Sequence, residues 1–452
     1  MGDSDSATTK NETLTNSDND SDFLPEIDVH MPIIRKSERT PKPKEFERYV
    51  TYQCAVNNLD DDPVTLDEAM SRPDAGGPGM AASGYGNFIE IGPYNMHMKP
   101  RKHTWIKDFN ILFVDSPIGT GFSYFSEKNA SLLTSTIDIG RDLVSFLKKF
   151  LETHKEFQTM PLYILKKFLE THKEFQTMPL YIFGESYGGK MAAEFAYQLE
   201  KEIKDGIMDV NLEGIGLGDS YTSPIDYVLN YAPFALTIGL IDKQGYKIID
   251  DLAQQTQKAV DKGLYEEAFD LEVKITNTLV ELTKGIDVYN IVIKSNSTSS
   301  PKLMSYEKKC NKFMNSFVKA RLDIPQKVTW HYTNRDIYNA LDQDIMRSVT
   351  DRIEYLLNNT DVKVIVYNGI FDFIVNTSGT LSWLDKLDWI GAPLWQNASQ
   401  EALEINMINE GYVRRAGNLI FYIVLRAGHS VPIDNIIAME EILRLEVLDG
   451  CD

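Results

Sequence analysis

The sequence predicts an α/β protein with a mostly parallel central sheet and a helical insertion. Two observations carry this prediction. From residue 76 onward, short apolar runs rich in Val, Ile, Leu and aromatic residues alternate with helix-like stretches, which is typical of a parallel sheet covered on both faces. Residues 225–340 instead repeat apolar residues at helical spacing among many Lys and Glu. We therefore expect a first part of the core at 76–224, the insertion at 225–340 and a second part of the core at 341–452.

Four runs are expected to form buried strands. They are residues 111–114 (ILFV), 180–183 (LYIF), 362–367 (VKVIVY) and 419–425 (LIFYIVL). Each is almost entirely apolar, as strands covered on both faces should be. Functional groups in open α/β sheets gather at the carboxyl ends of the strands. Side chains that directly follow these runs are thus candidate functional residues.

Composition and charge restrict the possible functions. The 452 residues include 46 basic and 66 acidic side chains, for a net charge of −20, and only three cysteines. An acidic protein is a poor partner for nucleic acid, because phosphate binding needs a basic surface. No run approaches the roughly 18 apolar residues of a membrane span, and three cysteines cannot build a disulfide scaffold. We expect neither a nucleic-acid partner nor a membrane span.

The first 75 residues differ in texture from the rest of the chain. Residues 1–48, acidic at first and then basic and broken by prolines, are expected to be disordered, because they can bury too little apolar surface to offset chain entropy. Residues 35–74 resemble the linker of copia-type retrotransposon polyproteins, which implies that the segment 49–75 is foreign to the rest. No hydrophobic region of a signal peptide is present in residues 1–28.

A tandem repeat stands before the most informative motif. The 18 residues LKKFLETHKEFQTMPLYI occur at 147–164 and again, unchanged, at 165–182. Each copy holds an amphipathic helical stretch followed by PLYI, and only one PLYI can form the strand that leads into the motif. Continuity favours the second copy. We therefore expect the other 18 residues to be extruded from the sheet.

The segment YIFGESYGG at 181–189 has the form of a nucleophile elbow. An apolar strand leads into G-x-S-x-G with Ser186 at its centre, and a helix-like run follows. The turn holds the serine hydroxyl clear of the sheet, and the helix N-terminus places a positive dipole near a developing oxyanion. Without its flanks the pentapeptide would equally be a glycine-rich turn. With them, the sequence predicts an α/β-hydrolase fold with Ser186 as nucleophile.

An acid and a histidine follow in the order that this fold requires. Asp372 comes soon after the strand 362–367, and His429 soon after the strand 419–425. Taken singly, the first could be a turn residue and the second a surface-loop histidine. Three strand-end matches in the right order favour a triad of Ser186, Asp372 and His429.

Five collinear motifs resemble the serine carboxypeptidase family, and residues 99–115 (KPRKHTWIKDFNILFVD), residues 216–226 (GLGDSYTSPID) and the helical middle resemble its retinoid-inducible branch. The five motifs are AGGPGMAASGYGNFIEIGP (75–93), NILFVDSPIGTGFSY (110–124), GESYGG (184–189), NGIFDFIVNT (368–377) and AGHSVP (427–432). The resemblance spans about residues 76–447. It implies a serine-type carboxypeptidase that releases C-terminal amino acids from peptides and proteins through an acyl-enzyme, without a cofactor or metal.

The resemblance also implies roles for residues around the nucleophile. Backbone N–H groups of Gly77 and Tyr187 would form the oxyanion hole, and the carboxyls of Glu90 and Glu185 would bind the free carboxylate of the substrate. Two close carboxyls cannot both ionise cheaply, so one should keep a raised pKa and donate a hydrogen bond. This predicts activity favoured at acidic pH. Without the resemblance, the GGPG loop could be ordinary and Glu90 a solvated turn residue.

One position departs from the family pattern. The family has Asn or Gln immediately before the GGPG loop, whereas this chain has Ala75, which cannot donate a side-chain hydrogen bond. Together with the foreign head, this implies that N-terminal strands of the sheet are missing. Two alternatives therefore stay open: a catalytically impaired relative that binds peptides or a partner, and an esterase or lipase on the same fold.

N-x-S/T sequons at Asn129, Asn296, Asn358 and Asn397 are candidate glycosylation sites. A fifth, at Asn376, lies too close to Asp372 for modification to be expected. With the family resemblance, the sequons imply the secretory pathway, with a lysosomal or secreted destination.

Overall fold

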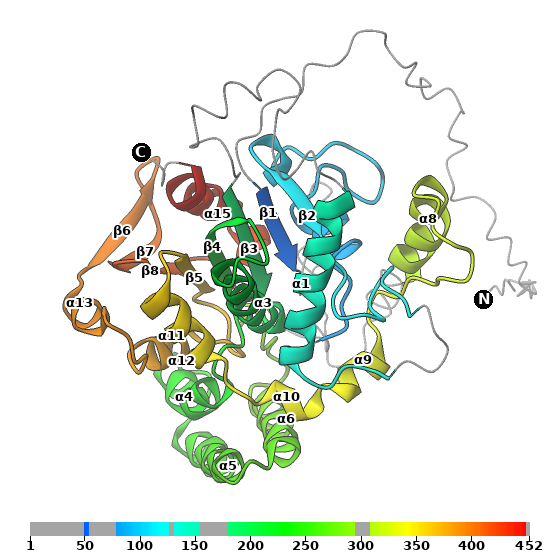
Figure 1. Cartoon of the computed structure of the whole chain (residues 1–452). Coiled ribbons are helices and arrows are strands. Elements are labelled where there is room, and N and C mark those ends of the chain that lie inside the picture. Colours follow the sequence, from blue (N-terminus) through cyan, green and yellow to red (C-terminus); the bar gives the residue numbers. More distant parts are fainter. Residues whose placement is uncertain (1–48, 54–77, 126–130, 154–178, 294–307, 449–452) are drawn as a thin grey trace, which may run out of the picture. The chain divides into compact units, whose positions relative to one another are not determined.

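The computed structural model describes residues 49–53, 78–125, 131–153, 179–293 and 308–448. Eight strands form one sheet in the order β2-β1-β3-β4-β5-β8-β7-β6 (Figure 1). Neighbours from β2 to β8 are parallel, and the last two pairings are antiparallel. The strands are β1 (Tyr49–Gln53), β2 (Asn110–Phe113), β3 (Pro179–Glu185), β4 (Asn211–Gly218), β5 (Lys363–Gly369), β6 (Gln400–Ile405), β7 (Ile408–Ala416) and β8 (Leu419–Val424).

Helices connect and cover these strands. The α-helices are α1 (Thr136–Thr153), α3 (Tyr187–Lys204), α4 (Pro224–Thr237), α5 (Lys243–Asp261), α6 (Tyr265–Leu282), α8 (Lys319–Arg321), α9 (Arg335–Ala340), α10 (Asp342–Ile345), α11 (Thr350–Asn359), α12 (Thr377–Leu384), α13 (Ala392–Asn397), α14 (Val431–Asp434) and α15 (Ile436–Leu443). None of the described helices is long and apolar enough to cross a bilayer.

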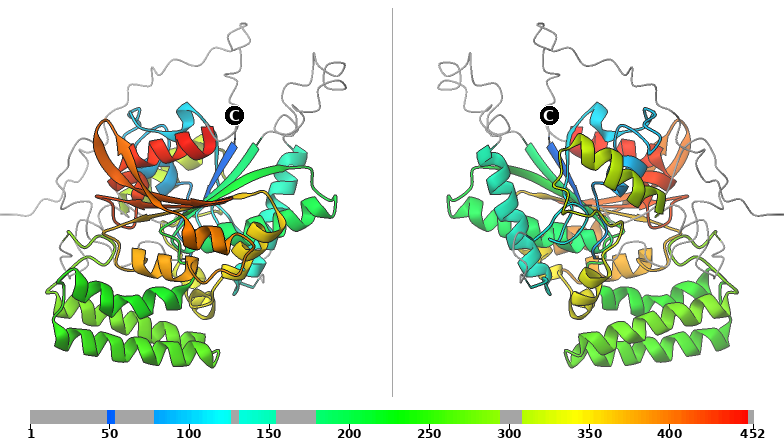
Figure 2. Two further views of the ribbon diagram at one scale, coloured as in Figure 1. Left: turned by 90° about the vertical axis from the view of Figure 1, so that its left-hand side faces the viewer. Right: turned by 90° about the vertical axis from the view of Figure 1, so that its right-hand side faces the viewer.

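The alternation of side chains along each strand produces two cores, one on each face of the sheet. Successive residues of a strand point to opposite faces. In β3, Leu180 and Ile182 join the core that contains α1, α3, α11 and α12, whereas Tyr181 and Phe183 join the core that contains α15. Figure 2 shows these helices on opposite sides of the sheet. Both faces are therefore dry, which explains the continuous apolar runs of the sequence.

The predicted fold class is confirmed. All four predicted strands are present, with ends that differ by two residues at most. The helical insertion contains α4, α5 and α6, which stack side by side beneath the sheet (Figure 2). Helix α5 begins where the Asp242 side chain accepts hydrogen bonds from the N–H groups of Gln244 and Gly245, the usual stabilisation of a helix N-terminus.

Four strands were not predicted, namely β1, β4, β6 and β7. Strand β4 is rich in glycine (NLEGIGLG), and β1 belongs to the segment that was interpreted as foreign. Strand β1 nevertheless pairs in parallel with both β2 and β3. Its residue types, YVTYQ, favour strands. That N-terminal strands of the sheet are missing stays a prediction, since residues 1–48 and 54–77 lie outside the described part of the chain.

The second copy of the repeat supplies the strand before the elbow, as predicted, and the first copy supplies the end of a helix. Strand β3 begins at Pro179, so the second PLYI leads into the nucleophile elbow. Helix α1 ends with LKKFLET of the first copy, at Thr153. Residues 154–178, between these two points, lie outside the described residues.

Candidate active site

Ser186 lies at the sharp turn between β3 and α3. Its φ of 58° and ψ of −126° place a non-glycine residue in a strained backbone conformation, which a nucleophile elbow imposes on its serine. Gly184 permits this turn, because a Cβ there would lie 2.2 Å from the carbonyl oxygen of Gly188. Position 184 therefore needs glycine for the chain to turn here.

The elbow is tied to the end of the neighbouring strand. The N–H of Ser186 donates to the carbonyl of Gly218 at 2.9 Å, and the carbonyl of Ser186 accepts from the N–H of Tyr221 at 2.9 Å. These bonds fix the strained turn from both sides. Ser186 is 6% exposed, so its side chain retains only a narrow access to solvent.

Asp372 and His429 meet at the carboxyl ends of β5 and β8. The Nδ1 atom of His429 lies 2.6 Å from Oδ2 of Asp372, and both side chains are buried. The N–H of Val375 donates to the other carboxylate oxygen at 3.1 Å. Because Nδ1 faces the carboxylate, Nε2 lies on the side of the imidazole ring that points away from Asp372. Among the described residues, that buried Nε2 has no hydrogen-bond partner.

The loop that carries His429 is held against the elbow. Ser430 donates from its hydroxyl to Oε1 of Glu185 at 2.9 Å. The backbone N–H of His429 donates to the backbone carbonyl of Tyr289 at 2.8 Å, and the rings of the two residues pack edge to face. The structure thus brings Glu185, which precedes the predicted nucleophile Ser186, into contact with Ser430, which follows the predicted base His429.

Glu185 and Glu90 are both buried, and the negative charge of Glu90 acts on Glu185. Burial, the negative charge of Glu90 and that of Asp219 raise the pKa of Glu185 well above its ordinary value. The Oε2 atom of Glu185 is buried and has no partner among the described residues. A raised pKa in this pair agrees with the expectation from the sequence.

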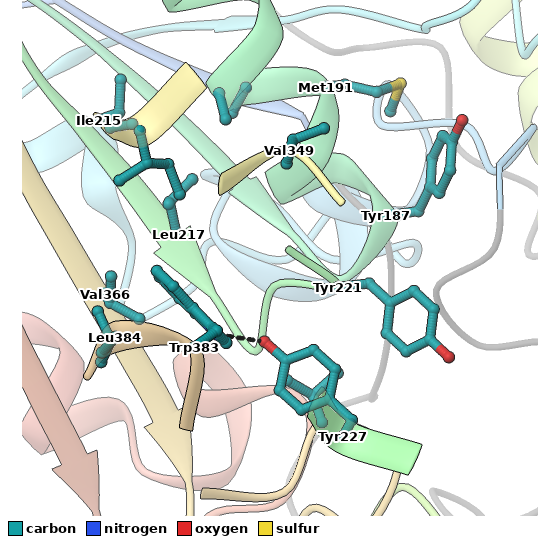
Figure 3. Close-up of a cluster of buried hydrophobic side chains, with 14 of the residues drawn as sticks. Tyr187, Met191, Ile215, Leu217, Tyr221, Tyr227, Val349, Val366, Trp383 and Leu384 are labelled. Atoms are coloured by element: carbon teal, nitrogen blue, oxygen red, sulfur yellow. Dashed lines mark hydrogen bonds between the residues drawn. The ribbon is translucent and has the colours of Figure 1, made fainter. Parts of the chain in front are cut away.

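Behind the elbow, the side chain of Tyr187 points away from the sheet (Figure 3). Its hydroxyl donates to Oδ2 of Asp344 at 2.9 Å, and burial raises its pKa strongly. In the same region Trp383 donates from Nε1 to the hydroxyl of Tyr227 at 2.8 Å, which in turn donates to the carbonyl of Ser220 at 2.7 Å. These bonds hold the loop after β4 beneath the site.

The remaining predicted residues divide by location. Gly77, Ala75, Asn129 and Asn296 lie outside the described residues. Asn358 and Asn397 are exposed. Asn376 is fully buried and begins α12, where its side chain accepts from the N–H of Gly379 at 2.8 Å.

Two buried acids of the site were missed from the sequence. Asp219 directly follows β4, with a carboxylate oxygen within 4.8 Å of one of Asp372, and Asp434 accepts from the N–H of Gly428 at 2.7 Å. Burial raises the pKa of Asp434 to about 6. Asp219 could have been found as a further acid at a strand end, had the glycine-rich β4 been interpreted as a strand.

The fold resembles that of a known peptidase. The structure of a prohormone-processing carboxypeptidase from Saccharomyces cerevisiae matches with a TM-score of 0.70 at 22% identity, over 89% of this chain and 83% of that chain. At this identity the likeness establishes the fold, an α/β-hydrolase fold with its added helices.

Sequence comparison gives the family. The chain is 36% identical over 382 residues to the retinoid-inducible serine carboxypeptidase of Rattus norvegicus, covering 79% of this chain and 80% of the relative. The human counterpart is 35% identical over 381 residues with the same coverage, and serine carboxypeptidase-like 51 of Arabidopsis thaliana is 30% identical over 390 residues, again with 79% and 80% covered.

The family model described as serine carboxypeptidase matches residues 75–165 and 163–447. The two matched pieces meet where the first copy of the repeat ends and the second begins. Each piece therefore holds one copy of the repeat. On this evidence the chain belongs to the serine carboxypeptidase family.

Proposed function

We propose that this protein is a serine-type carboxypeptidase in which Ser186, His429 and Asp372 carry out acyl transfer. The observation that carries the proposal is the buried contact of 2.6 Å between His429 and Asp372, beside a strained elbow that presents Ser186. An imidazole fixed by a carboxylate on one nitrogen is suited to move protons on the other.

The reaction follows from this arrangement. The hydroxyl of Ser186 attacks the carbonyl carbon of the last peptide bond, and Nε2 of His429 accepts its proton. The same proton passes to the leaving amino acid as the C–N bond breaks, which leaves an ester on Ser186. Water then attacks the ester by the reverse proton path and restores the hydroxyl. The charge on the carbonyl oxygen would be stabilised by N–H groups of Tyr187 and Gly77.

Glu185 and Glu90 would bind the free carboxylate of the substrate. A carboxyl that keeps its proton can donate a hydrogen bond to a carboxylate, whereas an ionised one repels it. The raised pKa of Glu185 supports this role and a preference for acidic pH. An esterase without a charged substrate end would have no use for this buried pair.

The cellular setting belongs to the same proposal. We assign this protein to the secretory pathway, with a lysosomal or secreted destination, because an acidic compartment suits a site that depends on protonated carboxyls. The exposed Asn358 and Asn397 are its candidate glycosylation sites within the described residues. Shift of the protein's mobility after treatment with an N-glycosidase would test this assignment.

Labelling with a fluorophosphonate probe tests the proposed nucleophile. The wild-type protein should be labelled, and Ser186→Ala should not be. Ser145→Ala is a matched control, because Ser145 is exposed on α1 and its loss should leave labelling unchanged. Absence of labelling in wild type, or equal labelling of Ser186→Ala, would contradict the assignment.

A further inference from the structure

Asp219 is a buried acid with no role in the reaction described above. It directly follows β4, is fully buried and has a φ of 38°. Its Oδ1 atom accepts from the N–H of Gly369 at 2.8 Å and from Nδ2 of Asn368 at 2.6 Å. Both donors lie at the end of β5, so one oxygen of Asp219 is fully engaged by the strand that leads to Asp372.

The other oxygen of Asp219 faces a second acid. Its Oδ2 atom is buried and has no donor among the described residues. The negative charge of Asp372 acts on this carboxyl, and potential ligand atoms of Asp219, Asp372 and His429 lie within 4.8 Å of one another. Two carboxyl oxygens can form a hydrogen bond only when one of them carries a proton.

We propose that Asp219 is a neutral carboxylic acid that donates a hydrogen bond to the Asp372 carboxylate and thereby positions it for His429. The statement that the positioned pair is catalytic rests on the proposed function. Asp372 is the acceptor of this pair, since its oxygens also face Nδ1 of His429 and accept from the N–H of Val375. Asp219 acts through Asp372 and is a positioning residue.

The surrounding charges support the same assignment of the proton. Burial and the charge of Asp372 raise the pKa of Asp219 well above its ordinary value. The titratable groups that act on Asp219 or on its partner Asp372 are Asp372, His429, Glu185, Asp434, Tyr227 and Tyr231. Three of them are carboxyl groups, and a negative charge at Asp219 would be repelled by that of Asp372.

Infrared difference spectroscopy tests the proton directly. The spectrum of wild type minus that of Asp219→Asn at neutral pH should contain the carbonyl stretch of a protonated carboxylic acid. Asp226→Asn is the matched control: Asp226 is also buried but is paired with Lys386, so its difference spectrum should contain carboxylate bands. Carboxylate bands in place of the acid band for Asp219→Asn would overturn the proposal.

Kinetics tests the positioning role. Asp219→Asn keeps the donor to Asp372 and both acceptor bonds, so its kcat/KM should stay within about threefold of wild type and its acidic pKa should not move. Asp219→Ala removes the donor, so kcat should fall about tenfold or more with KM nearly unchanged. The apparent pKa on the acidic limb of the kcat/KM profile of Asp219→Ala should rise. Without a hydrogen bond from residue 219, the carboxylate of Asp372 makes His429 more basic. A loss of activity without any change in that pKa would indicate only structural damage.

Two further outcomes separate this proposal from other accounts. Dialysis against EDTA should leave activity unchanged; loss of activity that a divalent cation restores would show that a metal ion, not a proton, joins the two carboxyls. If wild type has no peptidase activity, the proposed function fails. The infrared result would still decide the protonation of Asp219, since it needs no substrate.

Discussion

Acids crowd around Ser186, and the protein keeps several of them out of water. Glu185, Asp219 and Asp434 are all buried, and burial is the largest cause of the raised pKa of each. Their protonation decides which hydrogen bonds exist near the nucleophile, because a carboxyl donates only while it holds a proton. The pH therefore controls both the recognition of a substrate carboxylate and the support of Asp372.

The pH dependence of substrate binding can be tested at Glu185. As pH rises through its raised pKa, Glu185 loses the proton that it would donate to the substrate, so KM for peptides should rise. In wild type, KM should rise about tenfold for each pH unit above the pKa of Glu185. Glu185→Gln retains a donor at every pH, so its KM should lack this rise. Measurement of KM from acidic to neutral pH checks this. An unchanged KM profile in the variant would contradict the role of Glu185.

The sequence predicted those site residues whose position follows from one strand. Ser186, Asp372 and His429 each follow an apolar run that is recognisable by itself. Asp219 escaped because β4 is rich in glycine. The hydrogen bond from Ser430 to Glu185 depends on how two distant loops pack, and no local pattern encodes it.

At the scale of elements, helix α3 depends on a buried lysine in its first turn. Lys190 is fully buried and donates from Nζ to the carbonyls of Asp344 and Ile345 at 2.7 and 2.9 Å. Burial lowers its pKa to about 8. Lys190 thereby links the helix of the elbow to α10.

Replacement of this lysine should weaken the fold. Lys190→Met leaves two carbonyls and the nearby Asp344 carboxylate without their buried cation, so the free energy of unfolding should fall by about 3–5 kcal/mol. Urea denaturation measures this change. Lys204→Met, at an exposed position near the end of the same helix, should change stability little. Equal stability of both variants would show that the buried bonds of Lys190 contribute nothing.

Deletion of one copy of the repeat should leave the site intact. The deletion shortens the connection from the end of α1 to the start of β3 from 25 residues (154–178) to seven and keeps one PLYI for β3. A shorter connection costs less closure entropy, so stability should rise by about 1 kcal/mol. Urea denaturation and fluorophosphonate labelling together check this. Loss of labelling would show that both copies are required.

The elements that could be predicted are those whose burial is visible in their composition. The strands β3, β5 and β8 are covered on both faces, and their runs are correspondingly apolar. Strand β1 was not predicted because its segment resembles another class of protein, although its residue types favour a strand. The order of the strands follows from long-range pairing, which short sequence patterns do not specify.

On the scale of the whole molecule, the buried acids make stability depend on pH. Glu272 in α6 is buried and lies 3.2 Å from the hydroxyl of Tyr231 in α4. Burial raises its pKa to about 7 from 4.5. Since the folded state binds the proton more tightly than the unfolded chain, stability falls as pH rises from about 4.5 to about 7.

The contribution of Glu272 alone should be about 3 kcal/mol across this interval. Thermal unfolding at intervals from pH 4.5 to 7.5 should show the highest stability at the acidic end. Glu272→Gln removes the titration and should flatten part of that slope. Stability that rises with pH over the same range would contradict the assignment of neutral buried acids.

Hydrolysis of a blocked dipeptide, with and without a free C-terminal carboxylate, tests the central claim most directly. At acidic pH wild type should release the C-terminal amino acid from the free acid and should cleave the C-terminal amide at least about a hundredfold more slowly. The variant Ser186→Ala should cleave neither. Equal cleavage of acid and amide, or hydrolysis that persists in Ser186→Ala, would contradict a serine carboxypeptidase that uses Ser186.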